Sequence, residues 1–118
     1  MPSGDSLGQF EQLVLTAVVS LDDNAYGVTI HRKVEELSAP RSATLAAVYV
    51  TLDRLEKKGH VSSWLSEPTA ERGGRAKRCY RIEASGARAL TESIATARRV
   101  AAEVASAWGI SAEDWGKA

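Results

Sequence analysis

The sequence is poor in the residues on which metal, thiol and disulfide chemistry depend. It contains one cysteine, Cys79, and two histidines, His31 and His60, among 118 residues. A single thiol cannot form an internal disulfide, and neither histidine stands at a ligand-like spacing from it, so we expect no metal and no cofactor. We expect both histidines at the surface and interpret Cys79 as an inert thiol, with a redox switch as the alternative that the nearby bases allow.

The sequence also lacks the residue patterns of common active sites. It has no nucleophile at a plausible spacing from a base, no glycine loop that opens a helix around a phosphate, and no carboxylate pair in a predicted cleft. We therefore expect that the protein is not an enzyme.

Long hydrophobic runs are missing as well. The longest, "LVLTAVVSL" at 13–21, is far shorter than the ~20 residues that span a bilayer. The N-terminal "MPSGDS" has no basic start followed by an apolar stretch, so no secretion signal is predicted. We expect a cytoplasmic protein with no membrane partner. Its length and its 44% hydrophobic content suit one domain with a modest core.

Net charge is zero, but the charges are unevenly distributed along the chain. Residues 1–40 carry a net −4, residues 41–83 a net +4, and residues 84–118 a net 0. Five bases and no acid lie between 72 and 81, in "ERGGRAKRCYRI". Because a polyanion responds to the nearest patch and not to the total charge, this stretch indicates either an anionic partner or a solvated loop tip.

Hydrophobic spacing predicts three short helices, a hairpin and one long helix. Steps of three and four predict helices over 7–21, 27–37 and 44–58, and β-forming residues flanking a glycine-containing segment predict strands at 61–67 and 77–83. Ser6 and Thr44 are expected to cap the first and third helices, and Gly59 to end the third. The positions expected to face the core in the second and third helices are Ile30, Val34, Leu37, Leu45, Val48, Leu52 and Leu55.

The helical period returns from about residue 84 to 107, in a helix roughly 35 Å long. It is longer than so small a core can cover, and its apolar stripe would be an exposed patch in a monomer. Pairing of two copies would cover that stripe, so we expect a homodimer. The residues expected at the dimer interface are Leu90, Ile94, Ala97, Ala101, Val104 and Trp108.

This order of elements is that of a winged helix-turn-helix, an α+β and mostly helical fold. We expect it over residues 1–83, followed by a dimerisation helix over 84–108 and a tail over 109–118. In such folds the third helix enters the major groove of DNA, and the hairpin, or wing, reaches the flanking backbone or the minor groove.

The predicted third helix has an outer face suited to a groove. It is expected to present Ala46, Ala47, Val50, Thr51, Arg54, Lys57 and Lys58. Small side chains let a helix lie deep in the groove, Val50 can meet a thymine methyl group, and Thr51 and Arg54 can hydrogen-bond to bases or phosphates. Tyr49 lies at the edge of the inner stripe, where its hydroxyl could reach a phosphate or its ring could simply be half buried in the core.

The predicted wing tip carries charge and glycine together. Arg72, Arg75 and Lys77 can displace counterions from phosphates, while Gly73 and Gly74 let the backbone approach them closely and adopt positive φ.

Four stretches resemble the PadR-like family of bacterial transcriptional regulators. They are "FEQLVLTAVVSL", "AYGVTIHRKVEEL", "AVYVTLDRLEKKGHV" and "ERGGRAKRCYRI", in this order and spacing, and the resemblance covers roughly residues 7–90. It implies a homodimeric repressor that binds an inverted-repeat operator. One departure is Ile82–Glu83, where the family has leucine and threonine before the last helix, so the start of that helix is expected to be shifted by a residue or frayed.

The resemblance also implies which residues lie on the DNA side. Tyr26 is implied by it alone, with packing of the second helix as the alternative. Together with the residues of the third helix and of the wing tip named above, the expected DNA-binding residues are Tyr26, Thr44, Ala47, Tyr49, Val50, Thr51, Arg54, Lys57, Lys58, Arg72, Gly73, Gly74, Arg75 and Lys77.

Two further hypotheses concern partners. The chain resembles the shorter branch of the family, some members of which bind flat aromatic or drug-like molecules at the dimer interface, between the first and last helices. Phe10, Val14 and Trp108 are the candidate lining, with interface packing as the alternative for Trp108. The acidic first forty residues and the zero net charge also allow a winged-helix adaptor that contacts protein instead of specific DNA.

Overall fold

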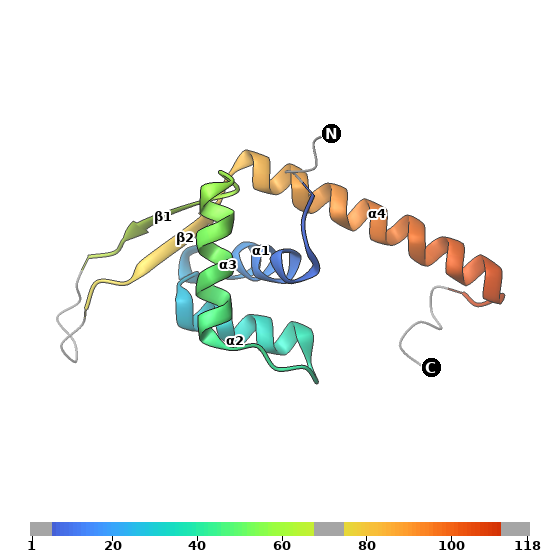
Figure 1. Ribbon diagram of the computed structural model, residues 1–118, viewed down its shortest axis with the longest axis horizontal. Coiled ribbons are helices and arrows are strands. Elements are labelled where there is room, and N and C mark those ends of the chain that lie inside the picture. The colour runs from blue at the N-terminus through green and yellow to red at the C-terminus, as the bar shows by residue number, and fades with distance from the viewer. Residues whose placement is uncertain (1–5, 68–74, 112–118) are drawn as a thin grey trace.

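The structure, a computed structural model, describes residues 6–67 and 75–111. The chain forms α1 (Gln9–Leu21), the short 3₁₀ helix η2 (Asp22–Asn24), α2 (Gly27–Ser38), α3 (Leu45–Lys57), β1 (Val61–Leu65), β2 (Arg78–Ile82) and α4 (Ala84–Trp108). The first three helices pack together, the strands extend to one side of them, and α4 extends to the other (Figure 1). The expected winged helix with one long last helix is confirmed.

The core lies where α1, α2 and α3 meet the strands. Its members are Val14, Leu15, Ala17, Val18, Ala25, Ile30, Val34, Val48, Leu52, Leu55, Val61, Tyr80 and Leu90. The expected inward positions are confirmed except for Leu37, which is 45% exposed, and Leu45, which is 37% exposed. Both stand at an end of their helix, Leu37 next to the last residue of α2 and Leu45 at the first residue of α3.

The helix ends follow local rules. Thr44 caps α3, since its Oγ1 accepts the amide hydrogen of Ala47 at 3.0 Å, and Gly59 follows α3 with a φ of 80°. Ser6 is not the cap of α1 as expected. Gly8 holds that place, and its N–H donates to the Glu11 carboxylate at 2.9 Å. A carboxylate at the third helical position can bond back in this way, whereas Ser6 lies outside the turn.

The two strands form an antiparallel ladder that pairs Val61 with Ile82 and Leu65 with Arg78. A bridge between Tyr26 and Cys79 adds the segment before α2 to the other side of β2, and the Tyr80 N–H donates to the Ala25 carbonyl at 2.9 Å. The base of the wing is therefore fixed to the helical part of the fold.

His60 is buried, with 2% of its surface exposed, so its expected surface position is wrong. The Ser85 hydroxyl donates to the Gly59 carbonyl at 3.0 Å, and this uses its only hydrogen. The 3.0 Å contact between His60 Nδ1 and Ser85 Oγ therefore requires that Nδ1 donates. His60 thus joins the end of α3 to the start of α4 through its ring and its backbone.

The start of α4 packs closely on this junction. The Glu83 N–H donates to the His60 carbonyl at 2.8 Å, and a Cβ at position 86 would overlap that same carbonyl oxygen. Only glycine fits there. Glu83 forms no side-chain cap, and its carboxylate accepts a hydrogen bond from Ser62 Oγ instead. The helix nevertheless begins at Ala84, without the shift that the Ile82–Glu83 departure suggested.

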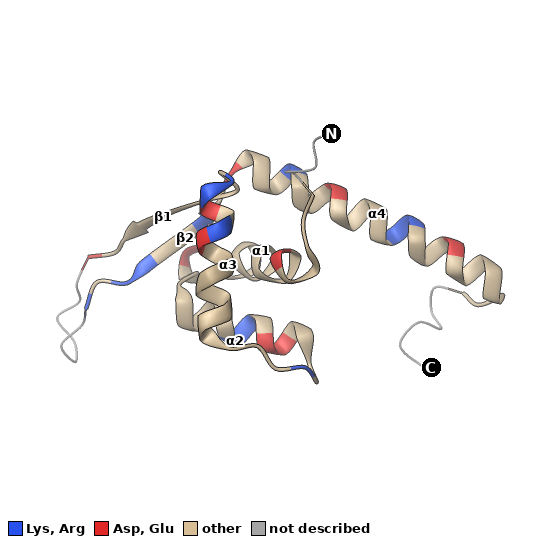
Figure 2. Ribbon diagram, in the orientation of Figure 1, with Lys and Arg blue, Asp and Glu red and all other residues tan. Residues whose placement is uncertain are grey.

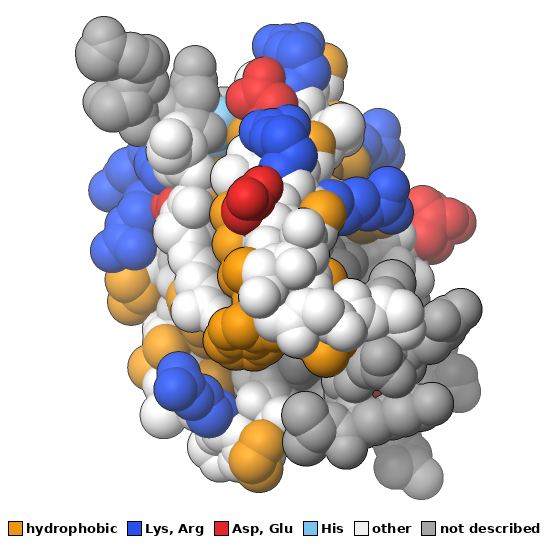
Figure 3. All heavy atoms as spheres, turned by 90° about the vertical axis from the view of Figure 1, so that its right-hand side faces the viewer, with side chains coloured by type: hydrophobic (Ala, Val, Ile, Leu, Met, Phe, Trp, Pro, Cys, Tyr) orange, Lys and Arg blue, Asp and Glu red, His pale blue; other side chains and the backbone are white. Residues whose placement is uncertain are grey.

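Beyond its first two turns, α4 leaves the core. Leu90 is 8% exposed and packs in the core of its own chain, which leaves little of its surface for the expected dimer interface. Further along the helix, Ile94 is 40% exposed and Trp108 is 70% exposed. The view toward the far end of α4 shows hydrophobic side chains gathered in the middle of that face (Figure 3).

Candidate nucleic-acid interface

The outer face of α3 combines small, apolar and charged side chains. Val50 is 57% exposed, Arg54 and Lys57 are exposed, and Ala47 is half-buried. Thr51 was expected on this face but is 4% exposed. At 100° per residue it lies beside Leu55 on the inner arc of the helix, so its hydroxyl is turned away from any groove.

Asp53 is a member of the outer face that the sequence reasoning did not include. It is exposed, follows Val50 by three residues, and its carboxylate lies 4.0 Å from the Lys57 ammonium. An aspartate at such a place can accept a hydrogen bond from the amino group of cytosine in the major groove. The signal was its helical spacing, which places it on the same face as Val50 and Lys57. Acids and bases alternate along this end of α3 (Figure 2).

Tyr49 packs on the start of α2. A Cβ at position 27 would overlap the Tyr49 hydroxyl, so Gly27 provides the space for the ring. The ring is nevertheless 44% exposed. The packing that the sequence left as one alternative is therefore present, and contact of the hydroxyl with DNA stays a prediction.

Lys58 was expected to face DNA, but its ammonium is held by the fold. It donates to the Glu11 carboxylate of α1 at 2.8 Å, with side chains 27% and 8% exposed. Burial by itself raises the pKa of Glu11, but the hydrogen bonds from Lys58 and Gly8, with the charges of Lys58 and Arg54, outweigh it and hold that pKa below its usual value of 4.5. This ion pair fastens the end of α3 to the start of α1.

Glu11→Gln is expected to lower the free energy of unfolding by about 1–3 kcal/mol at pH 7, because a hydrogen bond to a charged group is lost in a buried place. A carboxyl whose pKa is lowered on folding contributes stability above its unfolded pKa, and this is lost as the pH falls through the folded pKa. The difference between parent and variant should therefore shrink below about pH 4.5. Urea unfolding at several pH values measures it.

The matched control is Glu36→Gln on α2. Its exposed ion pair with Lys33, at 3.1 Å, should change stability by less than about 0.5 kcal/mol. Equal effects of the two substitutions would contradict the role assigned to Glu11.

Basic side chains follow the wing toward its tip. The Lys77 ammonium lies 4.2 Å from the centre of the Tyr26 ring, and the Arg81 guanidinium lies 5.0 Å from that of Trp64. Arg75 is exposed. The expected tip residues Arg72, Gly73 and Gly74 lie outside the described residues.

Tyr80 of β2 belongs to the core at the base of the wing. Burial raises the pKa of its phenol, and the nearby positive charge of Arg78 lowers it by a smaller amount.

The wing and α3, which holds the place of the DNA-recognition helix in winged helices, meet at Tyr26 and Gly27. Lys77 of the wing lies over the ring of Tyr26, and Tyr49 of α3 packs on Gly27. Tyr26, which the sequence reasoning took only from a resemblance, therefore contacts a basic residue of the wing arm. The Tyr26 residue is half-buried, and the Lys77 ammonium lies over its ring.

The candidate effector lining is not brought together. Phe10 lines a hollow beside the segment between α2 and α3, Val14 has no exposed surface, and Trp108 stands at the far end of α4. The three residues do not form a pocket within one chain, and the expected pocket at a dimer interface stays a prediction. Val14 is on the core side of α1, which periodicity alone cannot distinguish from a pocket wall.

The described residues offer little support for other kinds of site. Over 6–67 and 75–111, histidine, cysteine and acidic residues form no group that could hold a metal ion. In the same ranges, no helix has both the length and the apolar character needed to cross a membrane.

Fold and surface together define a winged-helix transcriptional regulator. The model of the transcriptional regulator PadR-like family matches residues 15–92, and the chain belongs to this family. No curated protein matches the chain.

Solved structures share the fold, and one of them is a member of this family. A PadR family transcription regulator from a hypervirulent Clostridium difficile is 25% identical, with 86% of this chain and 98% of that one covered and a TM-score of 0.64. A transcriptional regulator from Clostridium thermocellum shares the fold at 19% identity, 80% and 85% coverage and a TM-score of 0.65. The Orc1 protein of Aeropyrum pernix, solved in complex with DNA, is 25% identical over 80% of this chain and 26% of its own, with a TM-score of 0.61.

Proposed function

We propose that this transcriptional regulator is a homodimeric repressor that binds an inverted-repeat operator. The observation that carries the proposal is the meeting of wing and recognition helix at Tyr26 and Gly27. Because Lys77 and Tyr49 contact neighbouring residues, the base-reading face of α3 and the basic arm of the wing form one surface. The helix reads bases through Val50, Asp53 and Arg54, and the wing binds phosphates through Arg75.

Selection of bound duplexes from a randomised DNA pool tests the proposal, with affinity then followed against salt. We expect an enriched inverted repeat, bound at nanomolar concentration at moderate salt, with affinity that falls steeply as salt rises. If no sequence is enriched and binding stays weak at all salt concentrations, the proposal fails.

An adaptor that contacts protein is the second candidate. Asp53 and Glu56 are exposed on α3 among its bases, which lowers the positive charge that DNA would meet. Capture of partners from a lysate distinguishes the two functions, because partners of a DNA-binding protein that are held through DNA disappear after nuclease treatment, whereas direct protein partners remain.

The dimer of the proposal uses the exposed stripe of α4. Ile94→Asp is expected to convert a particle of twice the chain mass into a monomer, because a carboxylate at the centre of an apolar interface is left unpaired. Light scattering at micromolar concentration measures the mass. The control Thr96→Asp, exposed on the opposite side of α4, should remain dimeric. A monomeric parent would overturn this part of the proposal.

A further inference from the structure

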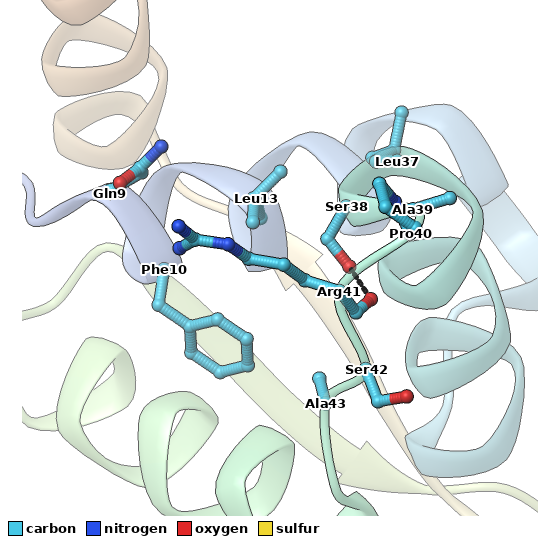
Figure 4. A pocket seen from close by; sticks show the side chains of 10 residues that line it. All are labelled: Gln9, Phe10, Leu13, Leu37, Ser38, Ala39, Pro40, Arg41, Ser42 and Ala43. Atoms are coloured by element: carbon cyan, nitrogen blue, oxygen red, sulfur yellow. Dashed lines mark hydrogen bonds between the residues drawn. The ribbon is translucent and has the colours of Figure 1, made fainter.

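A hollow of about 550 Å³ lies between α1 and the segment that joins α2 to α3 (Figure 4). Its volume is within the range of sites for small molecules, about 300–1,000 Å³. One wall is formed by residues 9, 10 and 13 of α1, and the other by residues 37–43. This place belongs neither to the outer face of α3 nor to the stripe of α4.

The described walls of the hollow combine apolar side chains with a few polar ones, of which one is charged. Phe10 and Leu13 are half-buried, and Leu37 is 45% exposed although it is a large hydrophobic residue. Among the lining residues that the structure describes, Arg41 alone carries a charge. A ligand here would therefore meet hydrocarbon on two sides and one guanidinium.

Arg41 is held by its backbone and leaves its side chain available. Its N–H donates to the Ser38 carbonyl at 3.0 Å, and its carbonyl accepts from Ser38 Oγ at 3.0 Å. Its guanidinium forms no hydrogen bond or ion pair with another residue of the described ranges. The side chain extends across the hollow toward α1, between the walls (Figure 4).

We propose that this hollow binds a small organic acid. Its apolar ring or chain lies against Phe10, Leu13 and Leu37, and its carboxylate pairs with the guanidinium of Arg41. A planar guanidinium can form two parallel hydrogen bonds to a carboxylate, which fixes the orientation of the ligand. A neutral molecule of the same shape gains only the apolar contact, and a cation is repelled. The site needs no DNA and no second copy.

The hollow adjoins the start of the recognition helix. Ala43 closes its wall, with its N–H donating to Glu35 Oε2 at 2.7 Å and its carbonyl contacting His31 Nε2 at 2.6 Å, and the next residue, Thr44, caps α3. An acid that holds residues 37–43 in one arrangement is therefore linked to the placement of α3. By reciprocity, any effect of the acid on DNA affinity is matched by an equal effect of DNA on the affinity for the acid.

Three probes of one shape and different charge test the site: 1-naphthoate, 1-naphthamide and 1-naphthylmethylammonium. Calorimetry on the full chain without DNA should show naphthoate binding at least about tenfold more tightly than the amide, and the ammonium probe most weakly. Arg41→Gln should reduce the affinity for naphthoate to that for the amide and leave the amide unchanged. The control Arg32→Gln removes an exposed charge of α2 outside the hollow and should change neither.

A second variant keeps Arg41 and reverses the preference. Leu37→Glu places a carboxylate on the exposed wall, and it should weaken naphthoate and strengthen the ammonium probe. Equal affinities of the three probes, unchanged naphthoate binding in Arg41→Gln, or no binding at millimolar concentration would each overturn the proposal. The proposal would also be overturned if naphthoate binding disappeared at protein concentrations high enough for dimerisation, because a second copy would then cover the hollow.

Discussion

Arg75→Glu protein is expected to bind operator DNA at least about tenfold more weakly than the parent, a loss of about 1.4 kcal/mol of binding free energy. Arg75 is exposed on the arm of the wing, two residues from the Lys77 side chain that lies over Tyr26. The substitution removes one phosphate contact and adds a repulsive charge. Titration of labelled operator at several salt concentrations measures it, and the salt slope should fall by about 1 or more.

A matched charge reversal on the far part of α4 separates this local effect from net charge. Arg99 is exposed, and its guanidinium contacts only the hydroxyl of Thr96 among the described residues, at 3.0 Å. Arg99→Glu should leave the operator affinity within about twofold of the parent at moderate salt, where distant charges are screened. Parent-like binding by Arg75→Glu would remove the wing from the interface.

Gly86→Ala is expected to destabilise the fold by about 1–3 kcal/mol, the usual cost of overpacking. The new methyl group would overlap the His60 carbonyl oxygen, which is backbone and also accepts the Glu83 N–H, so it cannot move aside as a side chain can. Urea unfolding followed by circular dichroism measures the loss.

The sign of this effect serves as its own control. Helix propensity alone favours alanine over glycine by about 1 kcal/mol inside a helix. Stabilisation of the Gly86→Ala protein would therefore show that the contact with His60 does not restrict position 86, and destabilisation would show that the contact outweighs propensity.

The order and length of the elements could be predicted because they depend on local rules. Thr44 and Gly59 mark the ends of α3 through their own chemistry, a hydroxyl that caps and a residue that accepts positive φ. The core face of α3 was predictable from spacing at Val48, Leu52 and Leu55. Two predictions for α3 were wrong. Leu45, at the first residue of the helix, is exposed, and Thr51, which was predicted on the outer face, is buried, as its angle on the helix requires.

Contacts between distant segments could not be predicted in the same way. The burial of His60 depends on the start of α4 crossing it, and the ion pair of Lys58 depends on Glu11, which is 47 positions away in the sequence. Neither partner is visible in a local pattern. Phe10 was predicted to line a ligand pocket. In the structure it lines a hollow whose other wall is the segment that includes Arg41. The helix period cannot predict this neighbour, because it depends on how α1 packs against α2.

The junction of His60 and Gly86 has a mechanical consequence for the proposed dimer. The 25 residues of α4 make a rod of ~37 Å, and its buried residues among those described all lie near its start. For a rod of this length, a tilt of about 5° at the junction displaces the far end by about 3 Å. Two such rods would join the recognition helices, which must be about one DNA turn apart to read two half-sites. The close packing of one glycine on one carbonyl would thus be one determinant of the distance between the half-sites.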